Sequence, residues 1–293
     1  SITLLFSAFK LRRILNRSKK SIVHWSDLSL MVPLLRIICG RKTRIVSSVL
    51  RYVPHRKILN RLRACALHFA NVVITSTKTA KKFLVCDGCN PSKIFIAPWG
   101  IDGLPQRQPH ITNNRTRLLW SGYIQQIGYD DFKHSVMLAR DVAKIRQDIE
   151  FTFCLKPESF KKSFLALENP GVRIIKGDEN FLSNLRKYDA LFSPILCSSS
   201  TLAPPLTWLA ALSAGLPIIT TRVAGIEELV TEGKSALLFE DYDSLRNWLM
   251  QKSNGFDKIR AMRQHACKEF VRRYKIDVVG EKYLTIYKNL FNK

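Results

Sequence analysis

Short apolar runs alternate with segments of helical periodicity along almost the whole chain. Runs such as "SIVHWS", "NVVITS" and "IEFTFCL" have the length of buried strands, and the segments between them have the spacing of helices. The pattern predicts strands at 21–26, 43–50, 71–76, 93–99, 118–122, 149–155, 172–177, 189–195, 217–221 and 236–240. It predicts helices at 4–19, 27–39, 55–70, 77–86, 131–145, 180–187, 206–214 and 225–231, and from 242 and 256 onward. Such alternation indicates an α/β fold with parallel sheets covered on both faces.

A polar stretch in the middle of the chain divides this pattern in two. The residues "GLPQRQPHITNNRTR" are rich in Pro, Asn and Gln, a composition typical of linkers. We therefore predict two Rossmann-like domains, at 1–102 and 115–275, joined by a linker at 103–114. A terminal helix at 276–293 is expected to pack back on the first domain. Doubly wound domains of this kind bind ligands in the crevice at the carboxyl ends of their strands.

Positive charge is concentrated in the first hundred residues. The net charge of the chain is +24, yet in this part the only acids are Asp27 and Asp87. Nucleic acid, anionic lipid headgroups or a pyrophosphate substrate would each attract such a surface, and a solvated face without a partner is a further interpretation. No zinc-finger spacing, aromatic RNA-binding motif or basic zipper is present, so no nucleic acid is expected. An anionic membrane surface is favoured, because the amphipathic segment 4–19 carries the cluster "KLRR".

The number and positions of the cysteines indicate whether the protein works in a reducing or an oxidising compartment. There are seven, mostly inside apolar segments, which favours free thiols in a reducing environment. Cys86-Asp87-Gly88-Cys89 has the spacing of a metal or redox pair, but no second pair or histidine cluster follows it, so a helix end and a turn is the preferred interpretation. No apolar run approaches the roughly 18–20 residues of a membrane span. We therefore predict a cytoplasmic protein, peripheral at the membrane face, without a bound metal.

Two of the predicted strand-to-helix loops carry candidate ligand groups. After "LLWSG", Gly122 would let the backbone approach a phosphate, and Gln125 and Gln126 offer neutral donors. After "FTFCL", Lys156 follows the strand directly and would compensate phosphate charge. The alternatives are a plain polar turn for the first loop and a solvated lysine for the second.

The third loop, "CSSSTLAPPLT", leads into the predicted helix 206–214. Backbone N–H groups at the first turn of a helix are not used inside the helix, and with the helix dipole they form an anion site. The groups expected here are the N–H groups of Leu206, Thr207 and Trp208, with the Thr207 hydroxyl beside them. The donor-site residues predicted in this loop are Ser199, Ser200, Pro205, Leu206 and Thr207. The alternative is a capped helix with Trp208 in the core.

Two longer strings resemble glycosyltransferase family 4. "NVVITSTKTAKKFLVCDGCNPSKIFIAPWGID" is similar to the end of that family's N-terminal domain, and "LTWLAALSAGLPIITTRVAGIEELVTEGKSALLFED" is similar to its donor-binding segment. The matching positions in the second string are Leu209, Ala211, Gly215, Pro217, Ile219, Thr221, Gly225, Glu228, Val230 and Gly233. The resemblance implies the GT-B fold, a nucleotide-sugar in the second domain, retention of anomeric configuration and no required metal. It also implies that part of the N-terminal domain precedes Ser1, because the family starts with an earlier strand and a glycine-rich loop.

Several charged residues of the family pattern are replaced in this chain. The paired glutamates, of which the second usually contacts the donor ribose, fall on Leu202 and Ala210. The arginine and lysine that hold the diphosphate fall on Tyr123 and near Ile127. Two acids and two bases are therefore lost together, so neutral groups could replace them. The neutral donors in the changed loops are Gln125, Gln126, Ser198, Ser199, Ser200 and Thr207.

These features lead to two functional hypotheses. The first is a retaining hexosyltransferase-type enzyme that moves a sugar from a nucleotide-diphosphate sugar, its co-substrate, to a lipid-linked or polysaccharide acceptor in cell-surface glycan synthesis. His24 matches the first histidine of the family's V-H-x-H motif, whose second falls on Ser26, and is a candidate for positioning the acceptor. The second hypothesis, suggested by Ala210, is a catalytically impaired homologue that acts as a membrane- or partner-binding scaffold.

Overall fold

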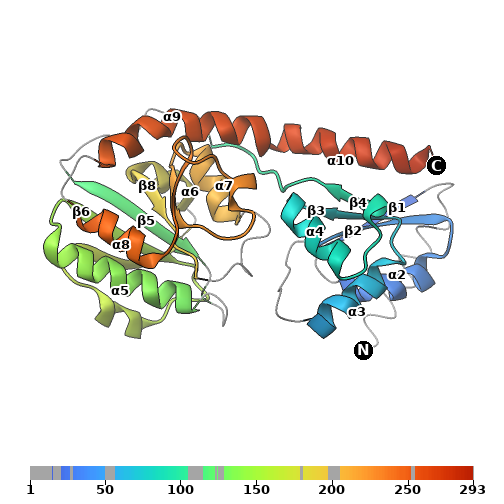
Figure 1. Ribbon diagram of the computed structural model, residues 1–293, viewed down its shortest axis with the longest axis horizontal. Helices are drawn as coiled ribbons and strands as arrows, with labels where there is room; N and C mark the ends of the chain where they lie inside the picture. The colour runs from blue at the N-terminus through green and yellow to red at the C-terminus, as the bar shows by residue number, and fades with distance from the viewer. Residues whose placement is uncertain are drawn as a thin grey trace. The chain divides into compact units, whose positions relative to one another are not determined.

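The computed structural model describes most of the chain. The described residues are 15, 21–26, 29–49, 57–104, 115–122, 124, 129–178, 181–196, 205–251 and 255–292. They form two compact units: one contains the described residues up to Trp99 and those from Val279 onward, and the other contains those between Gly100 and Val278. Each unit is built on one β-sheet (Figure 1). Almost all of the predicted helix at 4–19, and most of the predicted linker at 103–114, lie outside the described residues.

The first unit contains a four-stranded parallel sheet in the order β1-β2-β3-β4. Its strands are β1 (Ser21–Ser26), β2 (Thr43–Ser48), β3 (Val72–Thr75) and β4 (Ile94–Ile96). The segments between them contain the short 3-10 helices η1 (Ser29–Met31) and η2 (Pro91–Lys93), and the helices α2 (Val32–Cys39), α3 (Lys57–Leu67) and α4 (Lys78–Cys86). These elements confirm, to within a few residues, the strands and helices predicted between residues 21 and 99.

Side-chain alternation gives this sheet two apolar faces. Ile45 and Val73 belong to the core that α2, α3 and α4 cover. Val46 points to the opposite face, where Ile286 of the last helix, α10 (Ile276–Phe291), completes a second core. The sheet is therefore covered on both sides by helices, as expected for parallel strands that are buried on both faces.

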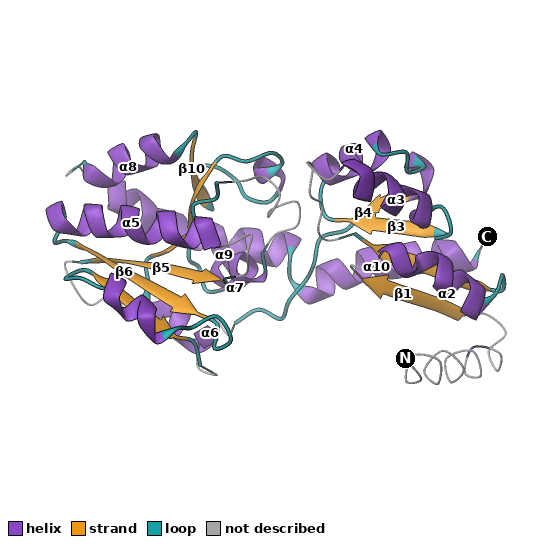
Figure 2. Ribbon diagram, turned by 90° about the horizontal axis from the view of Figure 1, so that it is seen from below, coloured by secondary structure: helices purple, strands orange, loops and turns teal. Residues whose placement is uncertain are grey.

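The second unit contains a six-stranded parallel sheet in the order β10-β9-β8-β5-β6-β7 (Figure 2). Its strands are β5 (Thr116–Gly122), β6 (Ile149–Leu155), β7 (Val172–Lys176), β8 (Ala190–Phe192), β9 (Ile218–Thr221) and β10 (Ala236–Phe239). Its helices are α5 (Tyr129–Ile145), α6 (Phe181–Asn184), α7 (Leu206–Ser213), α8 (Tyr242–Met250) and α9 (Gly255–Arg273). α5 and α8 cover one face of the sheet, and α7 and α9 lie on the other (Figure 1).

Most predicted elements of this unit are confirmed, but the predicted helix at 225–231 is wrong. A single 3-10 turn, η6 (Ile226–Glu228), stands there, and η3 (Lys162–Leu167) and η4 (Leu185–Lys187) are further short turns. The Thr231 N–H, which a helix over 225–231 would direct to the Glu227 carbonyl, donates instead to the Ser235 hydroxyl at 2.9 Å, and that hydroxyl donates to Glu269 of α9. Residues at the end of α9 and just after it then bind the last carbonyl groups of the turn. Arg273 donates to the Glu228 carbonyl, and the Tyr274 hydroxyl donates to the Leu229 carbonyl at 2.5 Å.

The Cys86-to-Cys89 segment is a helix end, as predicted. α4 ends at Cys86, and the chain turns at Gly88, whose φ is +103°. The Cys89 N–H then donates to the Leu84 carbonyl at 2.9 Å, the bond that closes a Schellman turn. Cys89 is buried, and this burial raises the pKa of its thiol to about 11. Among the described residues no group of three His, Cys, Asp or Glu side chains could hold a metal ion.

α7 ends in the same kind of turn, and two separate features of the structure favour glycine at position 215. Gly215 has φ +75°, and the Leu216 N–H donates to the Ala211 carbonyl at 2.8 Å. A Cβ atom added at Gly215 would lie 3.3 Å from the backbone carbonyl oxygen of Arg263 in α9. Both the left-handed backbone and the close approach of α9 therefore disfavour a side chain at this position.

We predict that Gly215→Ala lowers the free energy of unfolding by about 2–3 kcal/mol, because backbone strain and steric crowding add. Gly233→Ala is the matched control, since Gly233 has φ +72° but an added Cβ would meet nothing within 4 Å. It should cost only the strain, about 1 kcal/mol. Urea unfolding of both variants measures the difference, and equal losses would show that α9 does not restrict this turn.

Candidate functional site

The first turn of α7 presents backbone donors at the carboxyl edge of the second sheet. Pro205 precedes the helix with φ −56° and ψ 140° and makes no side-chain cap. The N–H groups of Leu206 and Thr207 have no acceptor among the residues that the structure describes. The dipole of a helix favours an anion at such a position.

One of the three N–H groups expected in this turn is already used. The Trp208 N–H donates to the Pro205 carbonyl at 2.9 Å, so the helix opens with a tight turn, and two of the three expected donors have no acceptor in the described part of the chain. The Trp208 indole is buried and donates to the Ser193 hydroxyl at 3.0 Å. The expectation that Trp208 offers a free N–H is therefore wrong, and its ring is part of the core.

The loops after β5 and β6 meet at the same edge. Gly122 at the end of β5 pairs with Leu155 at the end of β6, and Lys156 follows directly, exposed to solvent. The Ile124 N–H donates to the Ser159 hydroxyl at 3.0 Å, which joins the two loops. Sterics also favour glycine at position 122, because an added Cβ atom would lie 2.8 Å from the Trp120 ring.

The structure thus brings Gly122, Lys156 and the α7 first turn to one edge of one sheet, since β8, which leads toward α7, lies beside β5 in the sheet. The other residues predicted for this site lie outside the described residues. They are Gln125, Gln126, Ser199 and Ser200, together with the replaced positions Tyr123, Ile127 and Leu202.

Two side chains that sequence reasoning missed hold the segment that follows β8. The Asp131 carboxylate, in the first turn of α5, accepts the Leu196 N–H at 2.8 Å. The Thr221 hydroxyl at the end of β9 accepts the Ile195 N–H at 2.9 Å. Burial raises the pKa of Asp131, and the Leu196 N–H opposes that shift. The sequence does place Asp131 in the first turn of a predicted helix, but its hydrogen-bond partner depends on the fold.

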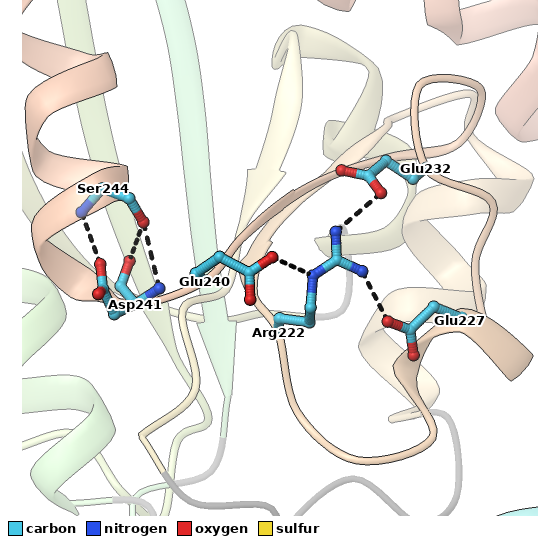
Figure 3. A network of polar contacts seen from close by, with 6 residues as sticks. All are labelled: Arg222, Glu227, Glu232, Glu240, Asp241 and Ser244. Carbon is cyan, nitrogen blue, oxygen red and sulfur yellow. Dashed lines mark hydrogen bonds and ion pairs between the residues drawn. The ribbon is translucent and has the colours of Figure 1, made fainter.

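Arg222 organises the loop that follows β9. Its guanidinium bonds Glu227 at 2.6 Å, Glu232 at 2.8 Å and Glu240 at 2.8 Å, each through a different nitrogen (Figure 3). The hydrogen bonds that Arg222 donates to Glu232 and Glu227 raise the pKa of its guanidinium. One cation therefore ties together η6, the approach to β10 and the residue after β10, in the loop that carries the family-like Gly225.

Ala210, the position where an acid was expected, is 6% exposed in the middle of α7. Every residue of the helix from Trp208 to Ser213 is buried. A carboxylate at this position would be enclosed by protein, and burying it would cost several kcal/mol unless a ligand or a side chain paired with it.

His24 lies in the first unit, on β1. Its Nδ1 is 2.6 Å from the Tyr287 hydroxyl and its Nε2 is 2.7 Å from the Ser48 hydroxyl, and burial lowers its pKa. Both ring nitrogens therefore have partners, and an acceptor hydroxyl would have to displace one of them. The contacts give His24 a role in docking α10 on the sheet; its role in positioning an acceptor stays a prediction.

Comparison with known proteins places this site in context. Residues 117–250, a little under half of the chain, match the family model described as glycosyl transferases group 1. This segment contains β5 to β10, α7 and the Arg222 loop. The match supports a role in glycosyl transfer. No curated protein matches the chain in sequence.

Solved structures with a similar fold share little sequence with the chain. TarM of S. aureus, crystallised as a mutant with fondaparinux, alpha-GlcNAc-glycerol and UDP, is 14% identical, with a TM-score of 0.76 over 98% of this chain and 58% of that one. HepE of Anabaena in complex with UDP-glucose is 13% identical, with a TM-score of 0.73 over 96% and 82%. A glycosyltransferase of Rickettsia africae is 14% identical, with a TM-score of 0.70 over 99% and 82%.

These structures confirm the predicted fold class, an α/β fold with two parallel sheets of the GT-B kind. Identities of this size support the fold only. The chain spans 57–58% of the length of TarM.

We predict that Arg222→Gln lowers the free energy of unfolding by about 1 kcal/mol, because three carboxylates lose their shared cation. The loss should shrink in high salt, which screens both the lost attraction and the remaining repulsion. Arg115→Gln is the control: its single exposed pair with Glu150, at 2.8 Å, should matter by less than about 0.5 kcal/mol. Equal stabilities of the two variants in chemical denaturation would mean that the Arg222 network adds nothing beyond one surface pair.

Proposed function

We propose that this chain binds a nucleotide-diphosphate sugar at the carboxyl edge of its second sheet and transfers the sugar. The observation that carries the proposal is the first turn of α7, with the N–H groups of Leu206 and Thr207 directed to the edge where Lys156 also lies. The diphosphate would accept from these N–H groups, and Lys156 would offset the charge that develops on it as the sugar leaves. The family match over 117–250 supports this assignment.

The neutral donors predicted around the diphosphate complete the proposed site. They are Gly122 through its backbone, Gln125, Gln126, Ser199, Ser200 and the Thr207 hydroxyl. An arrangement of neutral donors suits a chain that has lost two acids and two bases of the family pattern together, because the net charge of the site is unchanged. Uridine diphosphate is the first nucleotide to test, since the similar structures of TarM and HepE contain UDP or UDP-glucose.

The remaining parts of the function follow from the family resemblance. We propose transfer of a hexose with retention of anomeric configuration, to a lipid-linked or polysaccharide acceptor in cell-surface glycan synthesis. The protein would work at the cytoplasmic face of the membrane, and its basic first domain would contact anionic lipid. No metal and no tightly bound cofactor are needed for this chemistry in our proposal.

A scaffold without catalytic activity is the second candidate, and Ala210 is the observation that favours it. The family glutamate at this position contacts the donor ribose, and alanine cannot replace that hydrogen bond. A ligand hydrogen bond contributes about 1 kcal/mol, and a charged one about 1.5–3 kcal/mol. Under this hypothesis the folded protein binds no nucleotide-sugar and functions through its basic surface or a partner protein.

A thermal-shift screen separates the two hypotheses. Binding to the folded state raises the unfolding temperature in proportion to the logarithm of ligand concentration over Kd. UDP-glucose and UDP-N-acetylglucosamine are tested beside GDP-, ADP- and dTDP-sugars. A shift with one nucleotide supports transfer and identifies the donor base, whereas a folded chain that responds to none of them supports the scaffold.

We predict that Lys156→Ala weakens binding of the responding nucleotide-sugar by about tenfold or more, the effect of losing one charged hydrogen bond. Lys161→Ala is the matched control, because Lys161 is also exposed and lies only five residues further along; its Kd should change less than about twofold. Isothermal titration calorimetry measures both. An unchanged Kd in Lys156→Ala would remove this lysine from the site.

A further inference from the structure

The outward face of α3 is apolar where a solvated helix would be polar. Ile58 is 80% exposed and Leu62 is 55% exposed, and Cys65 is exposed on the next turn. At about 100° per residue these three positions fall within about 60° of one another, opposite the buried Asn60 and Ala64. Large apolar side chains spaced i, i+4 and i+7 on the solvent face form a continuous stripe.

α2 repeats the arrangement. Its core side carries Val32 and Leu35, while Leu34 is 46% exposed and Ile37 is 74% exposed. Leu30 in the preceding turn is 48% exposed and continues this line, again at the spacing i, i+4 and i+7. Two neighbouring elements therefore expose apolar side chains on the side away from the sheet.

The two stripes belong to one side of the first unit. α2 and α3 contact each other and both contribute to the core on the same face of the sheet (Figure 1). The opposite face of that sheet is covered by α10. The exposed side chains of α2 and α3 therefore form one surface, which we call the α2–α3 surface: Leu30, Leu34, Ile37, Ile58, Leu62 and Cys65.

The charged residues that the structure describes around the α2–α3 surface are basic. Arg41 and Lys42 are exposed in the turn after α2, and Lys57 and Arg61 are exposed along the flank of the α3 stripe. No acidic residue occurs in the sequence between Asp27 and Asp87. Arg36, by contrast, is fully committed to internal hydrogen bonds, including one to the Asn71 side chain at 2.7 Å.

We propose that the α2–α3 surface docks on an anionic lipid bilayer, with its apolar side chains in the interface and its cations at the headgroups. This surface would make the membrane contact that the proposed function includes, so the biological purpose of the inference rests on the proposed function. Its test does not. Burial of exposed apolar side chains and attraction between basic residues and anionic lipid act together at such surfaces. None of the described helices could cross a membrane, so the contact is with the bilayer surface.

The charge and the apolar side chains of the surface favour a lipid bilayer over a second copy of the chain or a nucleic acid. Two copies of the chain that buried this surface against each other would bring Lys57, Arg61 and their counterparts together without a counter-ion. A nucleic acid would satisfy the cations but would leave Ile37 and Ile58 in contact with water or phosphate. A bilayer with anionic headgroups accommodates both kinds of side chain.

Vesicle co-sedimentation of the intact chain tests the proposal without any nucleotide-sugar. We expect binding to phosphatidylcholine vesicles that contain phosphatidylglycerol, and weak binding to pure phosphatidylcholine. The double variant Ile37→Gln/Ile58→Gln should bind at least about tenfold more weakly, because two side chains no longer enter the interface. Lys57→Gln/Arg61→Gln should bind the anionic vesicles at least about tenfold more weakly, since each cation near the headgroups adds to the attraction.

Met137→Gln/Ile145→Gln is the matched control, because these side chains are 55% and 59% exposed on α5 of the second unit. It should bind vesicles like the unchanged protein, and circular dichroism checks that every variant is folded. Failure of the unchanged protein to bind, or equal binding by the Ile37/Ile58 variant, overturns the proposal. So does self-association, or duplex RNA binding, that is present without vesicle binding. A missing thermal shift with nucleotide-sugars would leave this result untouched.

Discussion

Burial of α7 on all sides is the constraint on which the second unit depends. From Trp208 to Ser213 every residue is enclosed, between the sheet and α9. A helix in this position can carry no charged side chain without a partner, and it needs an abrupt end, which Gly215 provides. Only its first turn reaches the surface, at the edge where the strands end. The anion site that we propose there would use the N–H groups and the dipole of the part of the helix that packing leaves accessible.

The same constraint explains what alanine does at position 210. The family pattern that the chain resembles has an acid here, which usually contacts the donor ribose. With Ala210 the buried helix carries no charged side chain. No unpaired charge therefore lowers the stability of the protein when no ligand is bound. In the function that we propose, donor binding would rest on the backbone of the first turn and on the loops beside it, instead of on a buried carboxylate.

The sequence predicted the fold well because parallel α/β domains repeat one local pattern. Apolar strands such as Ile149–Leu155 appear at the predicted residues, and the glycine turns after α4 and α7 follow from glycine after a helical run. The error at 225–231 arose because the Thr231 N–H donates to the Ser235 hydroxyl instead of to a helix carbonyl, and Ser235 in turn bonds Glu269, more than 30 residues away. The Arg222 network and the Asp131 bond to Leu196 were equally out of reach, because each depends on which loops the sheet order brings together.

The function that we propose requires the first turn of α7 to bind the diphosphate of a nucleotide-sugar. Backbone hydrogen exchange, measured with and without a saturating UDP-sugar, tests this binding, because it reports separately on the Leu206 and Thr207 amides. The account predicts that exchange at Leu206 and Thr207 slows when the nucleotide-sugar is present, while the amides of α3 are unaffected. A nucleotide-sugar that binds and stabilises the protein, but leaves exchange at Leu206 and Thr207 unchanged, would contradict it.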